Sequence, residues 1–388
     1  MHFELTDDQR RLREAARGLA AAFTDEYWAE CDANGEFPWE FYRAFADGGW
    51  LGIAIPEAYG GGGLGLLEAS LLMEEIAASG AGMNGCSTMH LSIFGLNTIV
   101  KHGSARLREE ILPRAADGSL HVCFGVTEPD AGTDTTRIGT FARRDGDDYV
   151  ISGRKVWITK AGQSQKMVLI ARTTPRADVA KPTDGMSLFL IDIESDAVEL
   201  KPIPKLGRNA VASYEVFIDD LRVPASARVG EEGEGFAYLL DGLNPERILL
   251  AHEALGIGRA ALARAVRYAN ERVVFDRPIG RNQGVAFPLA EAVTRLDAAE
   301  LMARNAAWRY DNGLSCGREA NMAKYLCADA GFAAADQAIQ THGGMGYARE
   351  YHVERYFRES RILRLAPVSQ EMVLNYVSTK VLGLPKSY

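Results

Sequence analysis

The stretch FGVTEPDAGTD, residues 124–134, passes from an apolar run into a segment dense in Thr, Asp, Pro and Gly. By itself this stretch predicts a strand followed by turns, because these residues are typical of turns. A second stretch, KVWIT at residues 155–159, predicts a strand in which Trp157 and Thr159 occupy alternate positions. Alternate residues of a strand share a face, so we expect these two side chains on the same face. Trp157 is equally compatible with an ordinary place in the core.

Both stretches lie within residues 121–233, where short runs rich in Val, Ile, Phe and Tyr are separated by turn residues. This pattern predicts a middle antiparallel β domain, either a barrel or a sandwich. Within that domain, residues 175–184 are predicted to form an exposed loop.

Helical periodicity flanks the middle domain on both sides. Residues 1–120 repeat apolar side chains at three- and four-residue spacing and predict an N-terminal helical domain. Residues 234–388 predict a C-terminal four-helix bundle, with long helical segments over 246–275, 283–313, 318–341 and 369–382. The order helix, strand, helix predicts an α+β fold and argues against a doubly wound sheet, in which strands and helices alternate throughout.

Glycine-rich segments give no evidence of a classical nucleotide-binding loop. The loop at residues 58–65 lacks a following Gly-Lys-Ser/Thr and a preceding apolar strand, so it is predicted to be a turn. No Gly-x-Gly-x-x-Gly opens a β-α-β unit. A nucleotide cofactor would therefore have to be held in another way.

Composition narrows the range of partners. The formal net charge of -9 disfavours binding to nucleic acid or to an anionic membrane, because both need a cationic surface. No stretch approaches the roughly 20 apolar residues that span a bilayer, and the first residues do not resemble a secretory signal. A cytoplasmic protein is therefore expected. The five cysteines are scattered, with no metal-ligand spacing, so we expect reduced thiols and no metal site.

Four motifs occur in an order that resembles the acyl-CoA dehydrogenase family. They are TEPxAGTD within residues 127–134, KVWIT at 155–159, ERVVFDRPIG at 271–280 with Gln283, and QTHGGMGY at 340–347. The resemblance covers nearly the whole chain. It implies the same order of helical domain, β domain and helical bundle, and an oxidoreductase that uses FAD.

The resemblance also implies two groups of FAD-binding residues. The first surrounds the isoalloxazine ring and consists of Phe124, Val126, Thr127, Trp157 and Thr159, with Thr133 touching either the flavin or the substrate. The second grips the pyrophosphate and adenosine across a subunit interface and consists of Arg272, Phe275, Gln283, Gln340, Gly343 and Gly344. A guanidinium suits phosphate oxygens, and glycines allow close backbone approach. Because the second group serves a neighbour's cofactor, we expect a homotetramer, or at least a homodimer. Asp276 stands where the family usually has Gly.

The implied reaction is dehydrogenation of an acyl-CoA thioester to the trans-2-enoyl-CoA. A carboxylate takes the α-proton while flavin N5 accepts the β-hydride. At the usual C-terminal position of this base, the sequence has Pro367. Isovaleryl-CoA dehydrogenase and some relatives carry the base earlier, in a Glu-Arg pair, and Glu246-Arg247 matches that place. Glu246 is therefore the candidate base, and Arg247 is a candidate substrate contact.

Glu246 can also be interpreted as a purely structural residue. Asn244-Pro245-Glu246 is typical of the start of a helix, where the helix dipole favours a carboxylate. Glu371 is the other acidic residue near the C-terminal position, but it falls in the following helical segment.

The sequence leaves two alternatives for each of two features of the substrate site. Pro367 lacks the backbone N–H that helps to polarise the thioester carbonyl in the family. Either a flavin ribityl hydroxyl and another donor do this work, or the backbone shifts and Val368 donates. In the predicted helix over residues 87–103, His90, Ile93 and Phe94 would narrow the acyl pocket toward short or branched acyl groups, or they belong to the core.

Three functions compete. The first is a dehydrogenase of fatty acid or branched-chain catabolism that passes its electrons to an electron-transferring flavoprotein. The missing C-terminal Glu leaves open an oxidase or flavin monooxygenase on the same fold. The third is an inactive flavin-binding paralogue, against which Glu246 argues.

Overall fold

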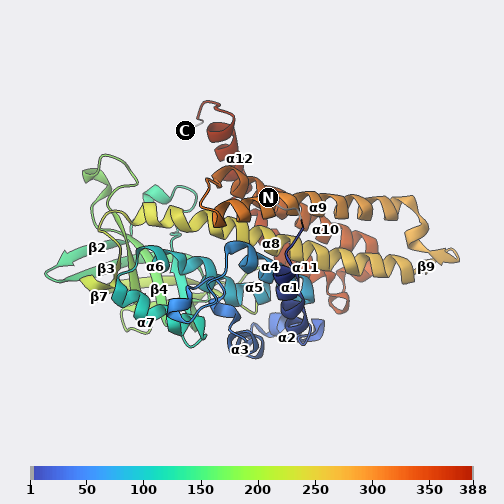
Figure 1. The fold of residues 1–388 in the computed structure, drawn as a ribbon, viewed down its shortest axis with the longest axis horizontal. Coiled ribbons are helices and arrows are strands. Elements are labelled where there is room, and N and C mark those ends of the chain that lie inside the picture. The colour runs from blue at the N-terminus through green and yellow to red at the C-terminus, as the bar shows by residue number, and fades with distance from the viewer. Residues whose placement is uncertain (1–3, 387–388) are drawn as a thin grey trace.

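The computed structural model describes residues 4–386 and has the predicted order of helices, strands and helices (Figure 1). In the N-terminal region, Thr6 and Gln9 form a capping box at the start of the first helix. The helices of this region are α1 Asp7–Ala20, α2 Asp25–Asn34, α3 Trp39–Asp47, α4 Leu66–Ile76, α5 Gly82–His90, α6 Asn97–His102 and α7 Ala105–Ala116. The single helix expected over residues 87–103 is divided, because a π-helical turn at Leu91–Gly95 separates α5 from α6.

The glycine-rich loop is a turn, as predicted. The amide of Gly62 donates to the carbonyl of Gly52, and the amide of Gly63 donates to that of Ile55. A Cβ added at Gly61 would lie 2.1 Å from the carbonyl oxygen of Ile55, so only glycine allows this close approach. These amides are therefore occupied by the protein's own carbonyls.

The middle region contains one sheet whose strand path is β6-β7-β3-β2-β4-β5-β8. Its strands are β1 Val122–Gly125, β2 Phe141–Asp145, β3 Asp148–Thr159, β4 Lys166–Arg172, β5 Met186–Asp192, β6 Val198–Pro202, β7 Ser213–Pro224 and β8 Arg228–Val229. The pairs are antiparallel except that β1 and β2 each run parallel to β4. The predicted surface loop lies between β4 and β5, and most of its residues are exposed. The parallel strand β1 carries the motif residue Phe124 beside β4.

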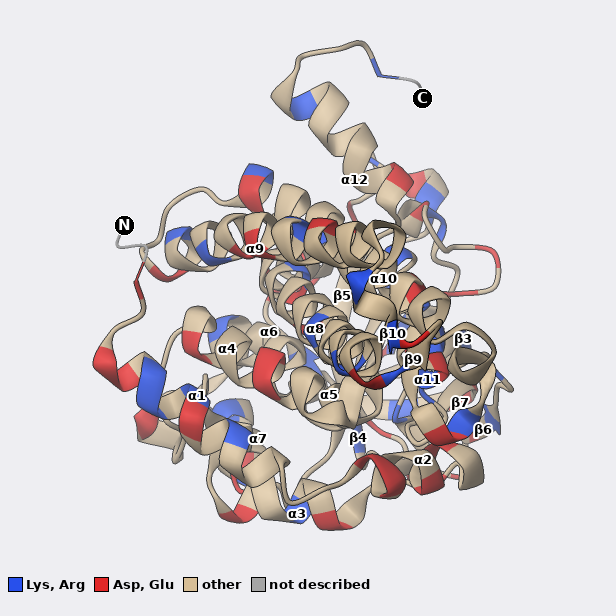
Figure 2. Ribbon diagram, turned by 90° about the vertical axis from the view of Figure 1, so that its right-hand side faces the viewer, with Lys and Arg blue, Asp and Glu red and all other residues tan. Residues whose placement is uncertain are grey.

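The C-terminal region is built on three long helices, α8 Gly235–Glu271, α9 Gln283–Asp311 and α10 Gly317–His342. Helices α8 and α10 approach so closely that a Cβ at Gly331 would lie 2.3 Å from the carbonyl oxygen of Ala254. A short helix that the sequence pattern did not predict, α11 Val353–Ser360, packs against both of them. The expected fourth helix, α12 Gln370–Tyr376, instead projects from the body of the molecule (Figures 1 and 2).

The start of α8 differs from the prediction, and the difference concerns Glu246. The helix begins at Gly235, so Pro245 and Glu246 lie inside it rather than at its start. Proline inside a helix leaves the carbonyl four residues earlier without its usual donor. That carbonyl, of Asp241, accepts from the side-chain amide of Asn97 at 3.4 Å. The reading of Glu246 as a helix-start residue is therefore wrong.

At the far end of α8, β9 Val273–Val274 and β10 Arg277–Pro278 form a hairpin. Its turn contains Asp276, which stands where the family usually has Gly. The two loop residues, Phe275 and Asp276, have φ angles of 52° and 61°. Positive φ at both positions is what a tight two-residue hairpin turn requires, and Asp tolerates this conformation. Asp276 therefore keeps the backbone in the left-handed region that the family's glycine would favour.

Charges lie mainly on the outer faces of the molecule. Figure 2 shows acidic and basic residues interspersed along α1 and α9. No helix within residues 4–386 is both long and apolar enough to cross a membrane. The same residues contain no group of three His, Cys, Asp or Glu side chains that could hold a metal ion.

Candidate active site

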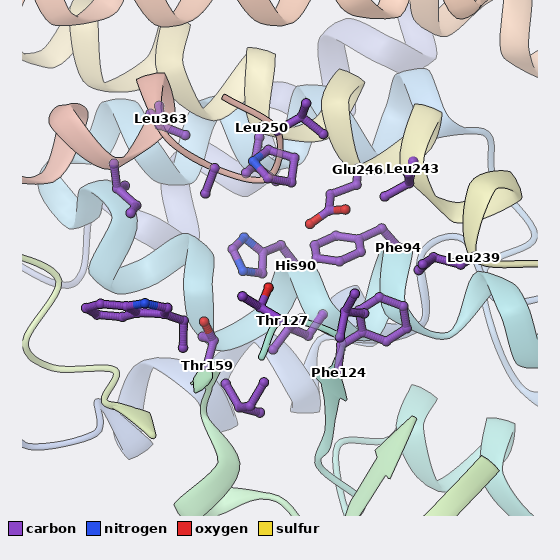
Figure 3. Close-up of a pocket in the computed structure, with 18 of the residues that line it drawn as sticks. His90, Phe94, Phe124, Thr127, Thr159, Leu239, Leu243, Glu246, Leu250 and Leu363 are labelled. Atoms are coloured by element: carbon purple, nitrogen blue, oxygen red, sulfur yellow. The ribbon is translucent and has the colours of Figure 1, made fainter. Parts of the chain in front are cut away.

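A cavity of about 280 Å³ lies where the three regions meet (Figure 3). Strands β1 and β3 form one wall, α5 and the following π turn form another, and α8 and the loop after α11 close it. Most of the lining is apolar. Beyond the residues discussed below, it includes Met83, Leu91, Ile158, Phe236, Ile362 and Leu363.

The five residues of the first predicted group all line this cavity: Phe124, Val126, Thr127, Trp157 and Thr159. Trp157 and Thr159 reach it although the strand is not regular between them. The pairing of β3 with β7 shifts between Lys155 and Ile158, and Trp157 has a φ of 64°. A left-handed conformation is costly for an aromatic residue, so the surrounding bulge must hold it in place. The indole is 55% exposed and also lines a second cavity, of about 180 Å³.

A buried ion pair joins the two motifs that supply these residues. The ammonium of Lys155 lies 2.8 Å from the carboxylate of Glu128 and donates to the carbonyl of Val126 at 3.1 Å. The same carboxylate accepts from the amides of Gly139 and Thr140. Burial alone would raise the pKa of Glu128, but Lys155 and these hydrogen bonds hold it below its ordinary value. The loop after β1 is thereby fixed against β3.

Glu246 points into the cavity from one face of α8 (Figure 3). Leu239, Leu243 and Leu250 share that face because they are spaced three or four residues apart, and all three line the cavity. The carboxyl faces this largely apolar space. Burial therefore raises its pKa to about 8, against a lowering influence of the neighbouring Arg247.

A second polar pair lies beside it. His90, the last residue of α5, lines the cavity, and its Nδ1 lies 3.0 Å from a carboxylate oxygen of Glu253 on α8. Neither side chain is more than 5% exposed. Phe94 also lines the cavity, whereas Ile93 is buried away from it.

Arg208 brings a buried cation to the cavity wall. Its guanidinium donates to the hydroxyls of Ser87, Thr159 and Ser213, at 3.3, 3.2 and 2.8 Å. No carboxylate lies within ion-pair distance of it among residues 4–386. Burial lowers the pKa of Arg208 to about 10. The nearby hydroxyl of Thr159 accepts from a cation and so keeps its own hydrogen free to donate.

The loop after α11 closes the cavity with Ala366, Pro367 and Val368. The Ala366–Pro367 peptide bond is cis. The amide of Val368 donates to no protein acceptor within the described part of the chain. Glu371 lies on the surface in the first turn of α12 and does not line the cavity.

The structure keeps several predicted site residues out of this cavity. Thr133 is exposed on the loop after β1, where its neighbours Gly132 and Thr135 reach the cavity instead. Arg247 points to a separate cavity of about 280 Å³ beside α12, which shares Val368 with the first. Its guanidinium donates to the side chain of Asn244 at 3.1 Å.

The second predicted group lies at the opposite end of the molecule, around the β9–β10 hairpin and the end of α10 (Figure 1). Phe275 is 93% exposed. A Cβ added at Gly343 or Gly344 would meet no atom within 4 Å. All six members are exposed: Arg272, Phe275, Gln283, Gln340, Gly343 and Gly344.

Sequence reasoning missed Arg208 and the partner of His90. Glu253 follows Glu246 by two helical turns on α8, so helical spacing could have placed it on the same side. Nothing in the local sequence of Arg208 marks it as a cavity residue.

Three family models match the chain: the acyl-CoA dehydrogenase N-terminal domain over residues 6–119, the middle domain over 123–221 and the C-terminal domain over 233–382. These models define the class, an oxidoreductase of the acyl-CoA dehydrogenase type. The chain belongs to the acyl-CoA dehydrogenase family.

Individual relatives match nearly the whole chain. It is 40% identical over 386 residues to the acyl-CoA dehydrogenase FadE12 of Mycobacterium tuberculosis (strain H37Rv), spanning 99% of this chain and 98% of that protein. It is 33% identical over 365 residues to subunit CarC of the caffeyl-CoA reductase-Etf complex of Acetobacterium woodii, spanning 93% and 94%. The solved structure of butyryl-CoA dehydrogenase from Megasphaera elsdenii is similar at a TM-score of 0.93 and 30% identity, spanning 98% and 100%.

Proposed function

We propose that this protein is an FAD-dependent dehydrogenase of acyl-CoA thioesters, with Glu246 as the base that removes the α-proton. The observation that carries the proposal is the position of Glu246: among the described residues it is the carboxylate that lines the cavity, between Leu243 and Leu250 of α8 and opposite the strand residues that resemble a flavin site. The product is the trans-2-enoyl-CoA.

The residues present fit a flat, polar-edged ring. Trp157 exposes an indole between two cavities, and Thr127 and Thr159 bring hydroxyls to the wall of the larger one. When bound, FAD supplies the acceptor for the β-hydride. Thr159, whose hydroxyl accepts from Arg208, is free to donate its hydrogen toward the ring. Phe124 and Val126 exclude water from the same wall.

Glu246 must be ionised to accept a proton. Its pKa of about 8 means that burial holds the carboxyl largely protonated at neutral pH in the free protein. A base whose pKa is high is also a stronger acceptor once it has ionised, which suits the removal of a weakly acidic C–H proton. The leucines around it keep water away from the carbanion-like centre.

For the thioester carbonyl, the protein-derived donor that we assign is the amide of Val368. Pro367 has no N–H, whereas the Val368 amide has no protein acceptor within residues 4–386 and its residue lines the cavity. This supports the reading in which the donor is shifted by one residue along the loop.

The second group of residues is proposed to hold the pyrophosphate and adenosine of a neighbouring subunit's FAD. Two observations support this: the group is exposed, and it lies at the far end of the molecule from the cavity. We therefore propose a homotetramer, or at least a homodimer. Thr133 and Arg247 remain proposed contacts of the substrate, outside the cavity that holds Glu246.

An electron-transferring flavoprotein is the proposed electron acceptor. Support comes from the relative in Acetobacterium woodii, which is named as a subunit of a complex with Etf.

Anaerobic mixing with a panel of acyl-CoA thioesters tests the function. The flavin absorbance of the wild-type protein should bleach, and that of Glu246→Gln should not, although the variant should retain its flavin. Bleaching of the variant at the wild-type rate would rule out Glu246 as the base. Rapid oxygen consumption after bleaching, faster than electron transfer to the flavoprotein, would identify an oxidase instead.

A further inference from the structure

His90 and Glu253 form a polar pair for which the proposed reaction has no use. Their contact of 3.0 Å joins the end of α5 to α8, and both side chains are at least nine-tenths buried. The ring of His90 lines the same cavity as Glu246, below and to the left of its carboxylate in Figure 3. The pair thus stands beside the reacting position.

The contact with Glu253 fixes which nitrogen of the imidazole carries hydrogen. A carboxylate only accepts hydrogen bonds, so Nδ1 donates to Glu253. In the neutral ring, Nε2 is then an acceptor. Among residues 4–386, no protein group forms a hydrogen bond with this Nε2.

The surroundings of His90 offer little to satisfy that nitrogen. The ring of Phe94 lies 5.4 Å from the imidazole, centroid to centroid, and Leu243 and Leu250 line the same cavity. Among residues 4–386, the second carboxylate oxygen of Glu253 is buried without a hydrogen-bond partner. Buried polar groups are normally hydrogen-bonded. A pair that served only to hold α5 against α8 would not need to present an acceptor to the cavity.

The other charged groups of the cavity have different tasks. The guanidinium of Arg208 is engaged by three hydroxyls. Glu246 is the proposed base. An acyl group made only of hydrocarbon would fill the cavity and leave the acceptor of His90 without a partner, which is unfavourable.

We infer that His90, oriented by Glu253, accepts a hydrogen bond from a hydroxyl group carried by the acyl part of the substrate. The substrate class is therefore acyl-CoA thioesters with a hydroxylated acyl chain. This inference rests on the proposed function. His90 is the specificity-determining residue, and Glu253 is a positioning residue that acts through it.

The test compares matched thioesters with and without the hydroxyl, using the FAD-loaded protein. Suitable pairs are hexanoyl-CoA with its terminally hydroxylated counterpart, and phenylpropanoyl-CoA with its para-hydroxy counterpart. These pairs place the hydroxyl at different distances from the thioester. The wild-type kcat/KM should favour one hydroxylated member by about tenfold or more, because a site built to bond a hydroxyl rejects analogues that lack it.

Variants of His90 give the decisive contrast. His90→Leu should reverse the preference, raising kcat/KM for the plain acyl group and lowering it for the hydroxylated one. His90→Gln, which keeps an acceptor oxygen, should restore part of the preference. Glu253→Gln should reduce the preference, because an amide can donate to Nδ1 and turn Nε2 into a donor. Phe94→Leu is the matched control, since it changes the shape of the cavity without its polarity and should affect both members of a pair alike.

The outcomes separate this inference from the proposed function. If no thioester bleaches the flavin, the proposed function fails, and calorimetric titration with the same pairs still measures whether His90 confers a binding preference. An unchanged ratio in His90→Leu for both pairs would overturn the inference even if both thioesters are oxidised. A stronger preference for a terminal carboxylate, as in adipyl-CoA, would also overturn it, because it would identify His90 as a cation.

Discussion

The ammonium of Lys155 and the carboxylate of Glu128 lie 2.8 Å apart, and their contact links the loop after β1 to β3. Lys155 is fully buried and Glu128 is 9% exposed at its side chain. The pair therefore sets the distance between the cavity residues of β1 and those of β3.

Lys155→Met should weaken this connection. Met keeps much of the side-chain length but leaves the carboxylate of Glu128 buried without its cation. Loss of one partner of a buried pair typically costs about 3–5 kcal/mol, so the free energy of unfolding measured in urea should fall by that amount. Arg154→Gln removes the exposed pair of Arg154 with Glu215 and should cost less than about 1 kcal/mol. Equal effects of the two substitutions would mean that the buried pair has no special role.

Glu246 should make the stability of the protein depend on pH. Its pKa is about 8 in the folded state against an ordinary value of 4.5, so the folded protein holds an extra proton between these values. Stability should therefore fall as the pH rises through this window. Glu246→Gln lacks the ionisable group, and its stability relative to the wild type should rise from pH 5 to pH 8. Urea unfolding at several pH values measures the difference; a constant difference would contradict the raised pKa.

The same pKa predicts the pH profile of catalysis. Only the ionised carboxylate can accept the α-proton, so kcat/KM for the best thioester should rise with pH, reach half of its maximum near pH 8 and level off above that pH. Stopped-flow bleaching under anaerobic conditions follows the chemical step directly. A profile already flat at pH 6 would point to a base other than Glu246, or to a Glu246 that is ionised much more readily.

Phe275→Asp should disrupt the proposed assembly without unfolding the chain. The side chain is 93% exposed at the hairpin tip, so its replacement removes no core contact. If the hairpin docks on a neighbouring subunit, the variant should sediment as a smaller species and lose FAD. Leu64→Ser, at an exposed position of the glycine turn, is the control and should change neither property. Wild-type mass with full flavin content in Phe275→Asp would refute the interface.

The five cysteines should be inert in the folded protein. All are buried without disulfide partners, and burial raises the pKa of each thiol above its ordinary value. Because the thiolate is the reactive form, a thiol reagent should label the native protein slowly and the denatured protein completely. Rapid labelling of even one thiol in the native state would contradict this.

Much of the fold was predictable because it follows from periodicity. The change from helical to strand patterns and back again appears in the sequence, and the structure has that order. The start of α8 was predicted too late in the sequence because proline is common in the first turn of a helix, and Pro245 indicated that turn. In the structure Asn97 satisfies the carbonyl that Pro245 leaves without a donor, and Asn97 lies far away in sequence. Helix α11 was missed because Arg355 and Glu359 are buried, and charged residues at buried positions obscure an apolar pattern.

The candidate site likewise contains residues that the sequence predicts and residues that it does not. Residues marked by motifs, such as Thr127 and Thr159, could be named from sequence because they belong to contiguous stretches. His90 and Glu253 lie on two different helices and are 163 residues apart in the chain, so no local sequence pattern reveals their contact. Strand alternation does not predict the left-handed backbone of Trp157, which depends on the bulge in β3.

The separation of the cavity from the β9–β10 hairpin has a genetic consequence under the proposed assembly. In each active site, one polypeptide would supply the catalytic base, and another would supply the residues that bind the adenosine of FAD. A gene copy encoding Glu246→Gln and a copy encoding Phe275→Asp would then each be inactive alone. Expressed together, they would complement one another. In mixed oligomers, some active sites would combine Glu246 of the Phe275→Asp polypeptide with Phe275 of the Glu246→Gln polypeptide.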